Sequence, residues 1–108
     1  MIILKDDTVK MAGIKPEMVV GLMLVQQVYS LVEVSCVITA GTEEFYLDGT
    51  RIHMKGSLHP QGYALDFRSR DIPKNDLDNF CDELQEMLKS EYQVIKHNTH
   101  IHVEFDLK

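Results

Sequence analysis

Two apolar segments with helical spacing predict the helices of this chain. The first follows Pro16 and continues to about Tyr29, and a proline suits the first turn of a helix because its missing N–H costs nothing there. This segment is apolar over most of its circumference, which predicts a largely buried helix. A second helix is predicted from about Pro73 to Lys89. Its apolar stripe consists of Leu77, Phe80, Cys81, Leu84 and Leu88.

Alternation of apolar and polar positions, with many β-branched residues, predicts the strands between and around the helices. We expect strands at residues 2–4, 32–39, 63–68, 92–96 and 100–105. No repeat or linker interrupts residues 1–108, which therefore form a single domain. The order of elements predicts an α+β fold, with a small, mostly antiparallel sheet and the helices packed on one of its faces.

The segment between the second and third strands, residues 41–57, is rich in glycine, threonine and charge and predicts a long loop. A loop of this length in a compact domain is usually functional or disordered. The longest apolar run, Met18 to Val25, is too short to cross a membrane. Asp6 and Asp7 precede it and no clear cleavage site follows, so we expect no signal peptide. The protein is then cytoplasmic as synthesised and reaches an outside substrate only if another factor releases it.

The composition excludes some classes of partner. Hydrophobic residues make up 44% of the chain and charged residues 26%, as in a protein with one modest core. The net charge is −6 and basic residues do not cluster, so we expect no nucleic-acid partner and no membrane partner. Cys36 and Cys81 form no CxxC motif and are expected to be reduced packing residues.

Four of the five histidines lie in two short stretches, SLHPQGYALD (residues 57–66) and HNTHIH (residues 97–102). In the first stretch, His59 precedes a predicted strand and Asp66 lies on it. The six residues between them are enough for the chain to turn and bring both side chains to one point. Gly62 allows the turn, and the small Ala64 leaves room on the same strand face as Asp66. Two such ligands plus a third are typical of a catalytic zinc site, which keeps a fourth position open.

The third ligand is expected from the second stretch. His100 and His102 alternate on one strand, so both imidazoles project from the same face of the sheet. His97 lies just across the turn and could reach the same pocket. The residues alone leave the choice among these three histidines open.

The two motifs together resemble those of a family of zinc peptidases. This family includes D-Ala-D-Ala carboxypeptidases and dipeptidases, phage L-alanyl-D-glutamate endopeptidases and the hedgehog signalling domain, and its pattern is S-x-H-x(6)-D followed by H-x-H. The stretch DGTRIHMKGSLHPQGYALDFRSRD (residues 48–71) is especially similar to the hedgehog and bacterial versions. The resemblance covers roughly residues 32–106 and implies a hedgehog- or DD-peptidase-like fold.

The resemblance also implies a role for each histidine. One zinc ion would be bound by His59, Asp66 and His102, while His100 would line the site without binding metal. Many relatives carry an acidic general base shortly before the last zinc histidine, but residues 96–99 here are Lys, His, Asn and Thr. His97 occupies one such position, and a neutral imidazole can accept a proton from water.

Three side chains that precede His59 in the chain, and one that follows His102, are further candidates for the site. His53 stands where hedgehog-like relatives also carry a histidine and could act in the transition state or support a ligand; an exposed loop histidine is the alternative. Arg51 could bind a substrate carboxylate, as an arginine does in carboxypeptidase relatives, although it could simply be solvated. Ser57 could bind substrate or hold the His59 loop in place. Glu104 could orient the imidazole of His102, or be a charge at the end of its strand.

Two functions remain in competition at this level. The first is a zinc peptidase that hydrolyses peptide bonds of peptidoglycan stems, of D,D or L,D type, with a phage or prophage source implied by resemblance. The second is a zinc-stabilised structural or interaction domain without turnover, which the missing acidic base favours. A domain that binds no metal would require both motifs to be coincidental.

Overall fold

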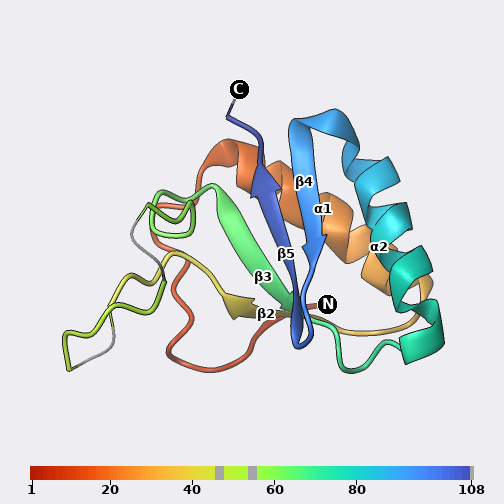
Figure 1. Ribbon diagram of the computed structural model, residues 1–108, viewed down its shortest axis with the longest axis horizontal. Coiled ribbons are helices and arrows are strands. Elements are labelled where there is room, and N and C mark those ends of the chain that lie inside the picture. The colour runs from red at the N-terminus through yellow and green to blue at the C-terminus, as the bar shows by residue number, and fades with distance from the viewer. Residues whose placement is uncertain (46–47, 54–55, 108) are drawn as a thin grey trace.

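The computed structural model describes residues 1–45, 48–53 and 56–107 and confirms an α+β fold. Figure 1 shows a sheet with α1 passing behind it and α2 beside its outer strand β4. The helices and strands are β1 (Ile2–Leu4), α1 (Pro16–Leu31), β2 (Cys36–Ala40), β3 (Ala64–Arg68), α2 (Lys74–Leu88), the short 3-10 helix η1 (Lys89–Glu91), β4 (Tyr92–Lys96) and β5 (His100–Phe105).

The five strands form one sheet in the order β1-β2-β3-β5-β4. The expectation of a mostly antiparallel sheet is wrong, because the sheet is mixed. β1 pairs with β2 in parallel, whereas β2 with β3, β3 with β5 and β5 with β4 are antiparallel. The chain between β1 and β2 carries α1, and such a crossover returns the second strand in the direction of the first.

One face of the sheet packs against both helices. Leu65 and Phe67 of β3 pair with Val103 and Ile101 of β5, and all four side chains are fully buried. The ring of Tyr29 on α1 lies against Phe67 at 6.2 Å between centroids and meets Phe80 of α2 edge-on at 4.8 Å. Both helices therefore cover the same face, as the sequence predicts. Side chains alternate along a strand, so Asp66 of β3 and His100 and His102 of β5 are directed to the other face.

Two details of the first helix and the following strand differ from expectation. The prediction that α1 is largely buried is wrong, since Val20 is 54% and Met23 63% exposed. The fold has only two layers, so nothing in the described chain covers the outer side of this helix. The strand predicted from residue 32 begins at Cys36 instead, because Glu33 takes a left-handed conformation (φ 58°) in the turn after α1.

The other, open face of the sheet carries the polar side chains of the two segments SLHPQGYALD (residues 57–66) and HIH (residues 100–102). Asp66 of β3 is directly opposite His102 of β5. The β2–β3 loop (residues 41–63) brings His59 onto this face, where its side chain is 3% exposed. Gly62 makes the turn possible: it has φ 86°, and a Cβ there would lie 2.2 Å from the carbonyl oxygen of Gly13.

Candidate metal centre

The structure brings together the three residues that the family resemblance implies as ligands. His59, Asp66 and His102 each offer a ligand atom, and these atoms lie within 4.8 Å of one another. Nε2 of His59 is 3.2 Å and Nδ1 of His102 is 2.8 Å from the same carboxylate oxygen, Oδ1 of Asp66. Two imidazoles and one carboxylate form a donor set that suits a catalytic zinc ion.

The backbone of the β2–β3 loop orients His59. Its Nδ1–H donates to the carbonyl oxygen of Gly41 at 3.0 Å, which leaves Nε2 as the ring nitrogen that faces Asp66. The N–H of His59 donates to Oγ of Ser57 at 3.1 Å. Ser57 therefore holds the His59 loop in place, which is one of the two roles expected for it. Its contact with substrate stays a prediction.

A carboxylate orients His102 in the same way. Nε2–H of His102 donates to Oε1 of Glu104 at 2.7 Å, which leaves Nδ1 facing Asp66. A ligand histidine whose second nitrogen donates to a carboxylate or carbonyl group is characteristic of zinc sites. The expected supporting role of Glu104 is thus present, and both histidines have their tautomer set by an acceptor of the protein.

The electrostatics of the cluster favour an ionised Asp66. Burial opposes ionisation of this carboxyl group, but the hydrogen bonds from His102 and His59 outweigh it and hold the pKa of Asp66 below its ordinary value. Burial also disfavours a charged His102, yet its hydrogen bonds with Asp66 and Glu104 raise the pKa of its imidazole. A proton on the imidazole of His102 would therefore compete with a cation for the position between these groups.

The other three histidines complete one connected cluster. The ring of His53 stacks on His59 at 4.1 Å between centroids, and the ring of His97 stacks on His100 at 4.6 Å. Nε2 of His100 lies 3.7 Å from Oδ2 of Asp66, too far for a hydrogen bond but beside the candidate centre. Burial lowers the pKa of His100, with the neighbouring histidines adding to this effect. All five histidines of the chain thus meet on the open face of the sheet.

Glu43 supports this cluster and was not predicted from the sequence. Its side chain is 8% exposed and accepts hydrogen bonds from the backbone N–H groups of Lys10 and Gly41, at 2.9 Å each, and from Nε2–H of His53, also at 2.9 Å. It thereby fixes both the carbonyl that orients His59 and the ring that stacks on it. Nothing in the local pattern Gly-Thr-Glu-Glu marks the first glutamate as buried.

Arg51 is engaged within its own loop. Its guanidinium group pairs with Glu44 at 3.1 Å and lies over the ring of Phe45, 5.0 Å from the centroid. The side chains of Arg51 and Glu44 are 40% and 45% exposed, so the ion pair is weak and screened by solvent. Binding of a substrate carboxylate by Arg51 stays a prediction.

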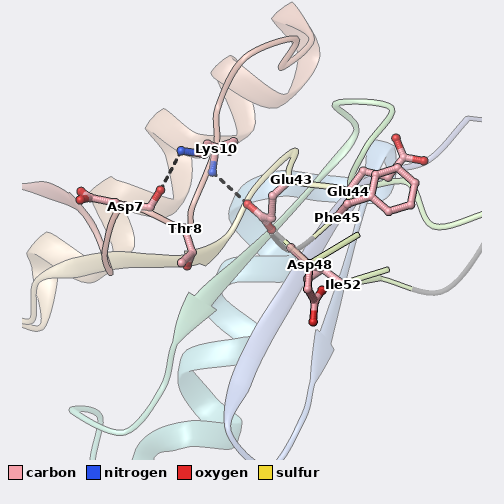
Figure 2. Close-up of a pocket in the computed structure, with 8 residues that line it drawn as sticks. All are labelled: Asp7, Thr8, Lys10, Glu43, Glu44, Phe45, Asp48 and Ile52. Atoms are coloured by element: carbon pink, nitrogen blue, oxygen red, sulfur yellow. Dashed lines mark hydrogen bonds between the residues drawn. The ribbon is translucent and has the colours of Figure 1, made fainter. Parts of the chain in front are cut away.

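A pocket of about 710 Å3 lies beside the cluster and is not the metal centre itself. Figure 2 shows its lining residues, which come from the segment before α1 and from the β2–β3 loop. None of His59, Asp66 and His102 lines it; Glu43 is the residue that it shares with the histidine cluster, through His53.

Comparisons with known proteins do not identify a family for this chain. No protein-family model matches the chain, and neither curated proteins nor solved structures match it. The resemblance to the zinc peptidases therefore depends on the two motifs and on the geometry described above. No helix of the described residues is long and apolar enough to span a membrane.

Proposed function

We propose that this protein is a zinc-dependent peptidase that hydrolyses peptide bonds of peptidoglycan stems. The observation that carries the proposal is the convergence of Nε2 of His59, Oδ1 of Asp66 and Nδ1 of His102 within 4.8 Å. His102 lies 36 residues beyond Asp66 in the chain, and the three residues follow one another in the order of the family pattern. Bond specificity of D,D or L,D type and a phage or prophage source follow from the resemblance.

A zinc ion in this site would supply Lewis-acid activation of the scissile carbonyl group and of water. The chain itself holds the ligands in place: the carbonyl group of Gly41 accepts Nδ1–H of His59, and the carboxylate of Glu104 accepts Nε2–H of His102. These contacts reduce the reorganisation that binding a metal would require.

Histidines on two sides of the ligands are the candidates for moving protons. His100, with His97 stacked on it, lies beside Oδ2 of Asp66. His53 lies on the other side, with its ring stacked on that of His59. The carboxylate of Glu43 accepts a hydrogen bond from His53 and fixes its orientation, in the way that a third group orients the base in many catalytic sites. We assign proton transfer to His97 or His100, and support of the developing negative charge to the remaining imidazoles.

A second function, a zinc-binding structural or interaction domain without turnover, has one observation in its favour. The three carboxylates described around the cluster are all engaged: Asp66 faces both ligand imidazoles, Glu104 accepts from His102, and Glu43 accepts three N–H groups. No carboxylate of the described residues therefore stands free beside the ligands as a general base.

Metal content and hydrolysis, measured on the same samples, separate the two functions. We would measure zinc per chain and cleavage of defined peptidoglycan fragments for the wild type, Asp66→Ala, His97→Ala and the control Asp82→Ala, which removes an exposed carboxylate of α2. The peptidase predicts one zinc per chain and cleavage that Asp66→Ala abolishes. Zinc without cleavage of any fragment would favour the silent domain. Absence of zinc from the wild type would contradict both.

His97→Ala tests the assignment of the base. If His97 carries protons, this variant keeps its zinc and loses turnover. If His100 is the base, His97→Ala retains most activity and His100→Ala loses it, again with zinc retained. Activity that survives both substitutions would refute proton transfer by this pair and leave His53 with Glu43 as the alternative.

A further inference from the structure

A second pocket, of about 590 Å3, lies where β3 ends and β5 begins, and residues of β2 and α2 complete its lining. We call it the basic pocket, because its lining includes Lys5, Arg68, Arg70 and Lys74. His100 also lines it, and the same side chain lies 3.7 Å from Oδ2 of Asp66. The basic pocket and the metal centre are thus neighbours that share one histidine.

The register of β3 and β5 explains this neighbourhood. Asp66 pairs with His102, and the next pair on the same face, two residues along, is Arg68 with His100. Two residues of an extended strand span about 7 Å, so the Arg68 position lies about that far from the ligand Asp66. An extended peptide covers the same distance with two residues, which places the basic pocket within one or two residues of a scissile bond held at the metal.

The charge of the basic pocket is unusual for this chain. The protein has a net charge of −6, yet the pocket collects four of its eleven lysines and arginines and no lining carboxylate. Among the described residues, no carboxylate forms an ion pair with Arg68, Arg70 or Lys74; only Lys5 has one, with Asp6 at 3.9 Å. Three cations therefore remain available to an anionic ligand.

Two hydrogen bonds hold the central residues of the pocket in place, one from the core and one from a neighbouring turn residue. The hydroxyl group of the buried Tyr29 donates to the carbonyl oxygen of Arg68 at 2.7 Å. Oγ1 of Thr99 bonds Nδ1 of His100 at 3.1 Å, so that Nε2 of this ring faces Asp66. An arginine on a fixed backbone can bind a planar carboxylate with two parallel hydrogen bonds at little cost in ordering.

We propose that the basic pocket binds a carboxylate of the substrate peptide next to the scissile bond, with Arg68 as its principal partner. The inference rests on the proposed peptidase function and adds the substrate class: peptides that carry a negative charge within two residues of the cleaved bond. The carboxylate is either the C-terminus of the peptide, in a carboxypeptidase reaction, or an acidic side chain.

The test compares substrates that differ by one charge. For zinc-loaded protein we would measure kcat/KM, and binding by calorimetry, for a stem peptide with a free C-terminal carboxylate and for its C-terminal amide. A hydrogen-bonded ion contact contributes about 1.5–3 kcal/mol, so the acid should be preferred about 10- to 100-fold. An amidated peptide with an acidic side chain near the bond identifies the second source: if it is bound as well as the acid, the side chain is the ligand.

Variants assign the preference to the pocket. Arg68→Gln should remove the preference for the charged peptide while zinc content is unchanged, and the exposed Arg70→Gln should reduce it without risk to the fold. Lys15→Gln is the matched control, because it removes an exposed charge outside the pocket and should leave the preference at the wild-type value. Equal use of acid and amide by the wild type, or loss of the preference in Arg51→Gln but not in Arg68→Gln, would overturn the proposal.

The two readouts keep this proposal separate from the peptidase itself. Carboxylate binding that depends on Arg68 in a protein without hydrolysis would support the basic pocket and refute the peptidase. Hydrolysis without any preference between acid and amide would support the peptidase and refute the basic pocket.

Discussion

Substitution of Glu104 tests the candidate metal centre without removing a ligand, because this residue would act on a bound metal only through His102. Its Oε1 accepts Nε2–H of His102 at 2.7 Å, and both side chains are mostly buried, with 24% and 15% exposed. Losing such a partner typically weakens metal affinity 10- to 100-fold. In free energy this is about 1.4–2.8 kcal/mol, within the range of a hydrogen bond to a charged group.

The assay is a competition for zinc against a chelator of known affinity at pH 8. Glu104→Gln keeps an oxygen that can accept the hydrogen bond but removes its charge, and we expect about a tenfold loss of affinity. Glu104→Ala removes the acceptor, and we expect a loss nearer to 100-fold. Glu86→Gln, which removes an exposed carboxylate from α2, is the matched control and should bind zinc as the wild type does.

The pH dependence of zinc affinity tests the role of Glu104 in a second way. Glu104 also helps to raise the pKa of His102, and a proton on this ring competes with the metal. The effect of Glu104→Gln should therefore shrink at pH 6, where the wild type loses more to this competition than the variant does. Wild-type affinity in both Glu104 variants at pH 8 would refute the claim that this carboxylate positions a zinc ligand.

Three further predictions concern stability and reactivity. Phe67→Ala empties a fully buried site between the sheet and α1 and should lower the free energy of unfolding by about 3–5 kcal/mol, measured in urea; a loss below 1 kcal/mol would contradict the described core. The pKa of Asp66 lies below its ordinary value, so its carboxylate stabilises the metal-free fold above about pH 4, and this contribution is lost as the pH falls towards the folded pKa. Thermal melts from pH 6 to 2 should show the loss, and Asp66→Asn should remove that part of the pH dependence. Burial raises the pKa of the Cys36 thiol to about 12, so iodoacetamide at pH 8 should modify it, in a Cys81→Ser background, only as fast as the protein unfolds; reaction at the rate of a free thiol would contradict this.

Features encoded over a few residues were predictable from the sequence. The period of two places Asp66 with Arg68, and His100 with His102, on one face of each strand whatever the partner strand is. The apolar stripe of α2 likewise identifies its buried face, and Phe80, Leu84 and Leu88 are buried as predicted. The need for glycine at position 62 follows from a turn that both the spacing and the structure require.

Contacts between distant segments were decided only by the tertiary structure. Glu43 became a buried support because the segment before α1 brings the N–H of Lys10 to it, 33 residues away in the chain. Which nitrogen of each ligand histidine faces Asp66 depends on acceptors from different elements, Gly41 and Glu104. The parallel pairing of β1 and the collection of four cations beside the metal centre also depend on strand order. The physical reason is that periodicity reports the face on which a side chain lies, whereas register and loop path determine what that face meets.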